Sequence, residues 1–249
     1  MKLKTIQASA LKSAFEVLKD ILNDVNIYFT SSGMRILTLD TAKVALVDMF
    51  LSAENFEEYT CQGDIVAGVN ITNMFKLLKF ISTNDTLTIE IKTREYLDIR
   101  IENSVKKSDT KFQLKLLDIN EDQIEVPDIE MNVTTTMSSI DFQRICRDMS
   151  NLSNYIEIIR EPNNFIIKCE GDFANQETSI ECSNNSDFTG TLGGKYSLKY
   201  LNLFTKATGM CSSVHIMQEE DNRFLVLKYN VANLGELKFY LSTKVFDDA

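Results

Sequence analysis

Apolar and polar residues alternate along much of the chain, with the period of two that is typical of β-strands half-buried against a core. The segment from Leu87 to Lys92 shows this pattern, because each apolar residue in it is followed by a polar one. The segment from Leu97 to Glu102 repeats it, and apolar segments of strand length run from Phe165 to Cys169, Phe224 to Val231 and Leu237 to Leu241. The sequence therefore predicts a fold rich in antiparallel sheet.

Four segments break this pattern, because their apolar residues recur at helical spacing. The predicted helices run from about Ser9 to Leu22, Thr72 to Ile81, Ser139 to Leu152 and Lys195 to Ala207, with Thr72 expected to cap the second. Their apolar stripes are Leu11, Phe15, Leu18 and Leu22; Met74, Leu77, Leu78 and Ile81; Phe142, Ile145, Cys146 and Met149; and Leu198, Leu201 and Phe204 or Thr205.

The helices form two equivalent pairs that lie half a chain apart. A predicted hairpin follows the first helix, from Ile27 through the turn at Ser31–Gly33 to Leu39, and a second follows the third helix, from Ile156 to Cys169. We interpret this as a duplicated domain of α+β class, in which each copy places two helices on an antiparallel sheet. The alternative is a chance likeness between two α+β halves.

The join between the halves is predicted in an acidic segment that ends near Pro127. We expect an N-terminal domain over residues 1–116, a connecting linker over 117–131 and a C-terminal domain over 132–249. The linker still spaces apolar residues at Leu117, Ile119, Ile124 and Val126, which a purely flexible tether does not need. It is therefore expected to lie on a protein surface and to pair with a strand edge.

Composition narrows the class of protein. The 249 residues are 44% hydrophobic, with two prolines and nine glycines, which predicts a fully folded chain. Five scattered cysteines without CxxC spacing indicate reduced thiols rather than a disulfide framework or a zinc site. With neither a signal-peptide pattern nor an apolar run long enough to cross a bilayer, the expected location is intracellular.

The net charge of −10 argues against a general nucleic-acid-binding protein unless the charges are segregated. Within the four predicted helices, counted to Asp20, Ile81, Ser150 and Ala207, nine basic and four acidic residues give a net charge of +5, so the remainder carries −15. Eight of the nine basic residues form four pairs, one on each helix, and the members of a pair are three or seven positions apart. Each pair therefore shares one helix face, opposite the apolar stripe. On any single helix this is typical of an ordinary solvated face; on four helices it indicates a shared cationic surface that attracts phosphates without reading bases.

Several segments resemble eukaryotic proliferating cell nuclear antigen (PCNA), the family of DNA sliding clamps. Phe142–Ser150 (FQRICRDMS) resembles the family's FxRICRDLS helix, and Lys199–Thr208 (KYLNLFTKAT) is similar to its RYLNFFTKAT segment. Gly68–Met74 (GVNITNM) is similar to GVNLTSM, and Leu234–Leu241 (LGELKFYL) to MGHLKYYL. The matches are colinear and extend from about Gln7 to Lys244.

The resemblance implies a head-to-tail homotrimer whose helices line a hole for duplex DNA, with a DNA polymerase and a clamp loader as partners. It implies no cofactor, no metal and no membrane contact, and a location in the nucleus or, for a virus-encoded protein, at a viral replication site. The residues that match DNA-facing positions of the family are Lys12, Lys19, Lys76, Lys79, Arg144, Arg147, Lys199 and Lys206.

The family also docks partner proteins through a short peptide motif, the PIP box, whose aromatic and aliphatic side chains enter a pocket beside the linker. By position this pocket would use Leu39, Val44, Leu46, Ile124, Val126, Phe224, Tyr240 and Leu241. The alternative is that these are routine core residues. Phe224 replaces a common proline and Ser242–Thr243 replace Ala-Pro, so the resemblance implies that the site exists but does not fix its shape or its peptide preference.

Subunit contacts in the family join two edge strands. The resemblance places the first over Lys111 to Leu117, with Phe112, Leu114 and Leu116, and the second near Glu177 to Cys182, with Ile180. A clamp subunit that assembles with different partner chains remains an alternative to the homotrimer.

The sequence offers little for catalysis. His215 is the single histidine and lies in a strand-like segment, where a surface or packing role is expected. GxSxG, HExxH, Walker-type and GxGxxG motifs are absent from the sequence. We therefore expect a protein without enzymatic activity; a metal-dependent nuclease built from scattered acids is the alternative from another class.

Overall fold

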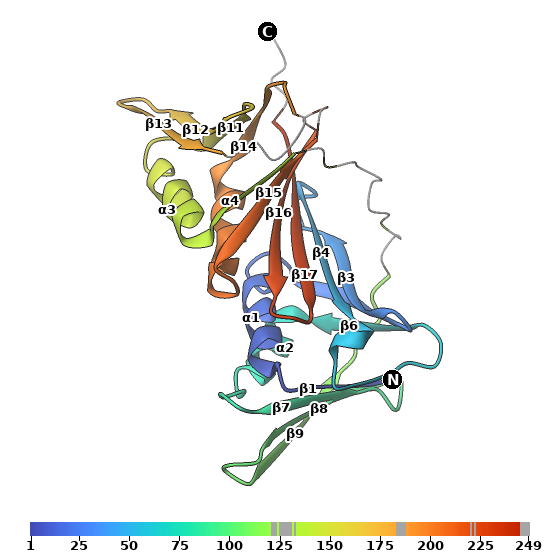
Figure 1. The fold of residues 1–249 in the computed structure, drawn as a ribbon. Coiled ribbons are helices and arrows are strands. Elements are labelled where there is room, and N and C mark those ends of the chain that lie inside the picture. The colour runs from blue at the N-terminus through green and yellow to red at the C-terminus, as the bar shows by residue number, and fades with distance from the viewer. Residues whose placement is uncertain are drawn as a thin grey trace. The chain divides into compact units, whose positions relative to one another are not determined.

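The computed structural model (Figure 1) describes residues 1–120, 124, 131, 133–182, 188–219, 221 and 223–244. The chain divides into two compact units. The first comprises Met1–Thr41, Val47–Glu125 and Asn230–Leu237, and the second comprises Ala42–Leu46, Val126–Tyr229 and Lys238–Ala249. Within the described residues, no helix is long and apolar enough to span a membrane.

The first unit contains, wholly or in large part, two helices and two sheets. One sheet has the strand order β5-β1-β7-β8-β9, and β4, β3, β2 and β6 are neighbours in that order in the other. The elements are β1 (Lys2–Thr5), α1 (Ala8–Leu18), β2 (Asp24–Thr30), β3 (Gly33–Leu39), β4 (Ala45–Ser52), the 3-10 helix η1 (Ala53–Asn55), β5 (Glu58–Thr60), β6 (Ile65–Asn70), α2 (Ile71–Leu78), β7 (Thr86–Glu90), β8 (Tyr96–Asn103) and β9 (Ser108–Lys115).

The second unit follows the same plan. One sheet has the order β13-β12-β11-β14, and β10, β15, β16 and β17 are neighbours in the other. The elements are β10 (Val133–Ser138), α3 (Ser139–Met149), β11 (Tyr155–Arg160), β12 (Asn164–Glu170), β13 (Asn175–Glu181), β14 (Leu192–Ser197), α4 (Leu198–Phe204), the 3-10 helix η2 (Thr205–Gly209), β15 (Ser213–Gln218), β16 (Phe224–Val231) and β17 (Gly235–Ser242).

Each unit begins with strand, helix and hairpin, as the duplicated pattern predicted. The first hairpin pairs β2 with β3 through a register that sets Ile27 opposite Ile36. The second pairs β11 with β12 and sets Ile158 opposite Ile167. Both pairings are antiparallel, and the four isoleucines are buried, so the α+β prediction is confirmed.

The helices pack in pairs within each unit, α1 beside α2 and α3 beside α4 (Figure 1). Their apolar stripes are buried as predicted except for Leu77, which is half-buried, because successive turns of an amphipathic helix present one face to the sheet. The fully or almost fully buried residues include Leu11, Phe15, Leu18, Met74, Leu78, Phe142, Met149, Leu198, Leu201 and Phe204.

Two helix starts differ from the prediction. Asn70, not Thr72, caps α2, since its side-chain oxygen accepts a hydrogen bond from the backbone N–H of Asn73 at 2.9 Å. The fourth helix begins at Leu198 rather than Lys195, because Lys195 lies in β14, opposite Glu157 of β11. Sheet pairing therefore outweighs the helical spacing at this point.

The predicted linker begins as an added partner of strand β6. The backbone N–H of Leu117 donates to the carbonyl oxygen of Gly68 at 2.8 Å, and the side chain of Asn26 donates to the carbonyl of Ile119 at 3.1 Å. A Cβ on Gly68 would lie 2.3 Å from the carbonyl oxygen of Leu117 and 3.1 Å from the side chain of Ile119. Glycine is required here because the linker backbone passes directly over the strand.

Replacing this glycine should therefore destabilise the first unit. We expect Gly68→Ala to lower the free energy of unfolding by about 1–3 kcal/mol, because the strand and linker must separate to admit the methyl group. The matched control is Gly209→Ala, where an added Cβ meets nothing within 4 Å. Urea unfolding of both variants measures the difference, and equal stabilities would contradict the close approach.

Candidate DNA-facing and partner-binding surfaces

Two of the predicted DNA-facing lysines of the first unit also hold its helices together. The Lys12 ammonium donates to the carbonyl oxygen of Ile81 at 2.9 Å, so that its stem ties α1 to the segment after α2. Lys19, at the C-terminus of α1, lies 4.5 Å from the ring centre of Phe75 on α2. Both lysines are half-buried, so part of their charge is engaged in structure.

The other two predicted DNA-facing lysines of this unit, Lys76 and Lys79, are exposed. Lys76 donates weakly to the side chain of Asn73 at 3.4 Å, and Lys79, which ends α2, makes no ion pair with the described residues. Both lie away from the buried Met74 and Leu78. The α1–α2 pair thus carries all four predicted positive charges of the first unit on its surface.

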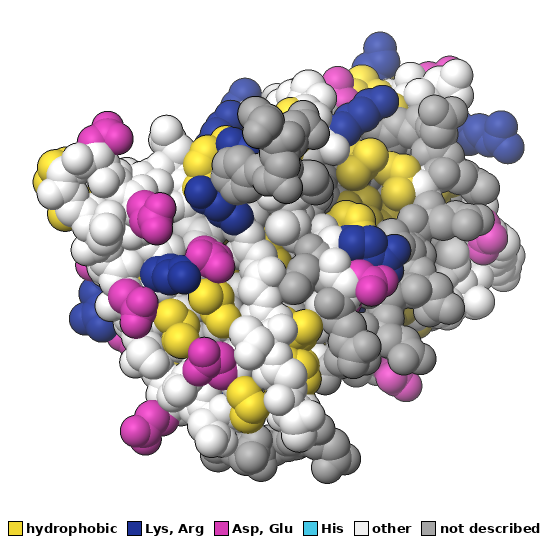
Figure 2. Space-filling view, turned by 90° about the horizontal axis from the view of Figure 1, so that it is seen from above, with side chains coloured by type: hydrophobic (Ala, Val, Ile, Leu, Met, Phe, Trp, Pro, Cys, Tyr) yellow, Lys and Arg dark blue, Asp and Glu magenta, His cyan; other side chains and the backbone are white. Residues whose placement is uncertain are grey.

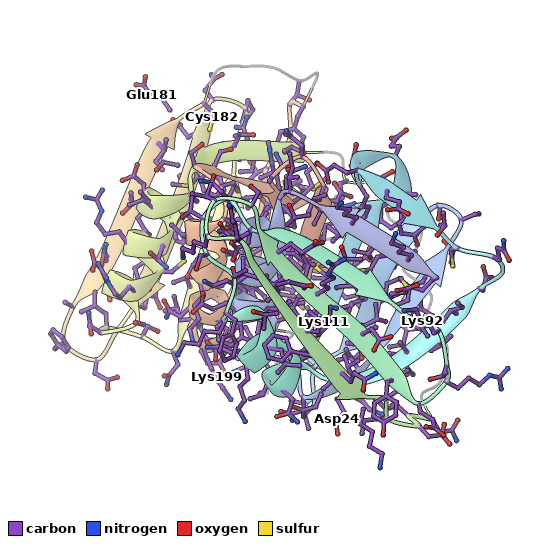
Figure 3. All side chains as sticks on the ribbon, turned by 90° about the horizontal axis from the view of Figure 1, so that it is seen from below. Asp24, Lys92, Lys111, Glu181, Cys182 and Lys199 are labelled. Atoms are coloured by element: carbon purple, nitrogen blue, oxygen red, sulfur yellow. The ribbon has the colours of Figure 1, made fainter. Side chains whose placement is uncertain are left out.

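The second unit carries the other four. Arg144 and Arg147 are exposed on α3, and Arg144 is paired with the exposed Asp141 at 3.0 Å. An exposed pair of this kind is worth little, so Arg144 stays available to a phosphate. Lys199 on α4 (Figure 3) lies 5.8 Å from the ring centre of Tyr200, and Lys206 is exposed on η2.

Charges of both signs are mixed elsewhere. Figure 2 shows a face on which acidic and basic side chains are interspersed, with hydrophobic side chains exposed between them. Ion pairs on the sheets, such as Lys2–Glu58, Arg100–Asp109 and Lys168–Glu157, are partly or fully exposed. Neither that face nor these ion pairs show the excess of basic residues that was predicted for the helices.

The two strands predicted to join subunits both lie at sheet edges. β9 pairs with β8 on one side and ends its sheet, and β13 pairs with β12 and ends another. Exposed and half-buried residues alternate along β13, and along β9 from Lys111 onward, so Phe112, Leu114 and Ile180 share the less exposed faces. Leu116 follows β9 directly. An edge strand offers unpaired backbone groups to another chain.

The exposed faces of these strands carry net charges of opposite sign, although β9 also bears Asp109, whose carboxylate lies 3.5 Å from the Lys111 ammonium. Lys111 and Lys115 project from β9, and Glu177 and Glu181 from β13; Figure 3 labels one residue of each pair. Sequence reasoning missed Phe80, whose ring lies 5.2 Å from that of Phe112 although Phe80 is 64% exposed. The available signal was an aromatic residue outside the apolar stripe of the helix predicted from Thr72 to Ile81.

The residues predicted for the peptide pocket are divided between the two units. In the second, Leu46, Tyr240 and Leu241 are buried, Val44 is exposed and Phe224 is half-buried. The Ser242 hydroxyl donates to the carbonyl oxygen of Val44 at 3.4 Å. Apolar side chains of graded exposure are therefore present at the predicted positions of this unit.

In the first unit, Leu39 and Ile124 are half-buried, and Val126 lies outside the described residues. Ile124 lines a cavity of about 290 Å³ on the sheet, together with Tyr28, Leu37 and Phe50. Among the predicted pocket residues that the structure describes, Ile124 alone lines that cavity. The apolar floor of this cavity was not predicted from the sequence. The available signal was the set of apolar residues at the outward-facing positions of neighbouring strands.

His215, the candidate for acid–base chemistry, is half-buried in β15, where its Nδ1 lies 2.9 Å from the Thr136 hydroxyl. Burial, and secondarily the charge of Lys228, hold the pKa of His215 below its ordinary value. Burial also raises the pKa of the Cys146 thiol to about 12, and all five cysteines are free. In the described part of the chain, no three His, Cys, Asp or Glu residues cluster as metal ligands.

The structure predicts that Lys12 and Lys79 differ in how much they contribute to the stability of the fold. We expect Lys12→Ala to lower the free energy of unfolding by about 1 kcal/mol, since it leaves the carbonyl of Ile81 without this donor. Lys79→Ala should change it by less than about 0.5 kcal/mol, because its side chain is exposed. Urea unfolding of the two variants measures this, and a larger loss for Lys79→Ala would contradict the geometry.

Comparison with known proteins gives the same assignment for both units. The sequence profile of the proliferating cell nuclear antigen N-terminal domain matches residues 1–125, and that of the C-terminal domain matches residues 125–244. The chain is 40% identical to "Probable DNA polymerase sliding clamp 1" of Paramecium bursaria Chlorella virus 1, over 96% of this chain and 95% of the relative. It is 32% identical to "Proliferating cell nuclear antigen" of Chaetomium thermophilum, over 97% of each chain. The chain therefore belongs to the proliferating cell nuclear antigen family of DNA sliding clamps.

Proposed function

We propose that the chain forms a homotrimeric ring around duplex DNA and acts as the processivity factor of a DNA polymerase and as a docking platform for replication and repair proteins. The observation that carries the proposal is a pair of amphipathic helices in each unit, with apolar stripes buried and basic side chains outside. The domains are proposed as residues 1–116 and 132–249, joined by the linker 117–131.

The helix pairs supply the DNA contact. Lysine and arginine side chains that lie outside the buried stripe can follow phosphates without reading base edges. The half-buried Lys12 and Lys19 would add to the positive electrostatic potential more than they would contact DNA directly. The exposed Lys79, Arg147 and Lys199 can reach the phosphate backbone of the DNA. Binding should therefore be weak, sensitive to salt and independent of sequence, which suits a ring that slides.

The two edge strands supply the subunit contact. In an antiparallel pair of β9 with β13 of a neighbour, we propose a register that sets odd-numbered residues opposite odd-numbered ones, so that charged faces meet and apolar faces meet. Lys111 and Lys115 are four residues apart, as are Glu177 and Glu181, so opposite charges can come together along the pair. Phe112, supported by Phe80, would be buried on the other face.

Partners would dock at the predicted peptide pocket. Val44 is exposed, Phe224 is half-buried and Tyr240 is buried, which supports a surface that accepts an aromatic side chain of a partner. An aromatic side chain gains free energy from burial and loses little conformational entropy when it is ordered. The polar Ser242 beside Val44 favours a peptide that also offers a hydrogen-bonding group. A clamp loader and a polymerase are the proposed users of this pocket.

The proposed role needs no catalytic residue and no cofactor. The protein would act where DNA is copied, in the nucleus or at a viral replication site. A DNA-cleavage assay with added magnesium tests this part, and cleavage by the purified protein would favour the nuclease alternative.

The charge pairing of β9 and β13 predicts how the trimer responds to reversal. Lys111→Glu with Lys115→Glu should weaken assembly at least about tenfold, since like charges then face each other across the strands. Adding Glu177→Lys and Glu181→Lys should restore it. Light scattering at several concentrations measures the mass against three times the 28.4 kDa of the chain.

Failure of the quadruple variant to recover, or a double variant that assembles normally, would contradict the pairing. A wild-type protein that stays monomeric at micromolar concentration would instead indicate assembly with different partner chains. Circular dichroism of each variant controls for folding, because the four side chains are exposed.

The basic helix faces predict an effect on DNA synthesis without an effect on the fold. Replacing Lys76, Lys79, Arg144 and Arg147 with glutamate should impair loading or sliding, because repulsion replaces attraction to phosphates. Polymerase processivity on a long primed template measures this, with light scattering to show that the trimer persists. Normal processivity with the quadruple variant would refute the proposed DNA-facing surface.

A further inference from the structure

An apolar pocket lies on a face of the first unit's sheet that polar residues would ordinarily occupy. Tyr28 of β2, Leu37 of β3 and Phe50 of β4 line a cavity of about 290 Å³, with the hydroxyls of Thr30 and Ser32 beside it. All three large side chains are half-buried. Solvent-facing positions of an antiparallel sheet are mostly polar, so three neighbouring strands with large apolar residues indicate a surface meant to be covered.

One of the apolar side chains that line it comes from the predicted linker. Ile124 lines the same cavity, on the same unit of the chain. The basic group at this pocket, Arg35, is already bound to Asp48 through two hydrogen bonds of 2.8 and 3.0 Å. Ile124 itself is apolar, so what it can provide at this pocket is contact with the apolar floor of Tyr28, Leu37 and Phe50.

Two earlier points of attachment lead the linker to this pocket. Leu117 is hydrogen-bonded to Gly68 of β6, and Ile119 accepts a hydrogen bond from Asn26 of β2. Because the strand order is β4-β3-β2-β6, these contacts and Ile124 advance across the sheet from one strand to the next. The linker is thus held at three points on one unit.

We propose that the pocket of Tyr28, Leu37 and Phe50 is an intramolecular docking site for Ile124, which straps the linker to the sheet in the partner-free clamp. A linker side chain engaged there is not available to a partner peptide. Peptide binding that uses Ile124 must first release it, so the pocket sets a threshold for partner docking. This last step rests on the proposed peptide pocket, whereas the strap itself does not.

Amide hydrogen exchange of the fragment covering residues 117–126 tests the strap. Ile124→Ser and Leu37→Ser should each speed exchange of this fragment by at least about fivefold, since each removes one side of the same contact. The double variant should exchange no faster than either single variant. Ile6→Ser, which changes an exposed isoleucine elsewhere in this unit, is the matched control and should leave the fragment unchanged.

Unchanged exchange in Ile124→Ser would overturn the strap, and so would effects of the two substitutions that multiply in the double variant. Ile124→Ser keeps this test valid even if Leu37→Ser disturbs the sheet, because Ile124 lies outside every strand. Exchange of the β2 and β3 amides in the same experiment shows whether the sheet is intact.

Calorimetry with a short peptide containing an aliphatic residue and two adjacent aromatics tests the threshold. Leu37→Ser should raise the peptide's affinity about threefold to tenfold, because the released linker no longer pays for leaving its pocket. Equal or lower affinity would overturn the threshold. A wild-type clamp that binds no such peptide would refute the proposed peptide pocket and the threshold together, and would leave the exchange result standing.

Discussion

Burial of four apolar helix stripes is the constraint on which the rest of the molecule depends. Phe15 in α1 and Phe142 in α3 are completely buried, and each fixes the rotation of its helix about the axis. Once that rotation is set, the basic residues between the apolar ones have only the opposite face to occupy. A strongly acidic chain can thereby present a cationic surface, since helix rotation rather than total charge decides where the lysines lie.

Assembly into a ring depends on sheet edges in the same way. β9 and β13 each end a sheet, and exposed edges invite unwanted pairing unless they are used or protected. Here the two edges carry net charges of opposite sign, so each suits the other better than it suits itself. This favours head-to-tail contact between copies over contact of like edges, and the same alternation keeps Phe112 on the face away from the lysines.

The sequence predicted best where one periodic pattern acted alone. The β2–β3 and β11–β12 hairpins, the buried stripes and the repeated element order followed from local periodicity. Lys195 was assigned to a helix because spacing cannot show that β11 offers a ladder partner, and Asn70 was overlooked as a cap because β6 runs directly into α2. Ile124 lines the same cavity as Leu37 and Phe50, and these residues are far apart in the chain, so no local pattern could reveal that they come together. The positions of β9 and β13 at sheet edges followed from the family resemblance, because hydrophobic periodicity does not determine the order of strands in a sheet.

The central claim is that the protein is held on DNA by enclosure rather than by tight binding. The most direct measurement is retention of the purified clamp, loaded onto nicked circular DNA by a clamp loader, before and after the circle is cut open. We expect stable retention on the circle at salt concentrations that abolish phosphate contacts, and rapid loss from the linear product because the ring slides off the ends. Equal retention on circular and linear DNA, or loss from both as salt rises, would contradict the account.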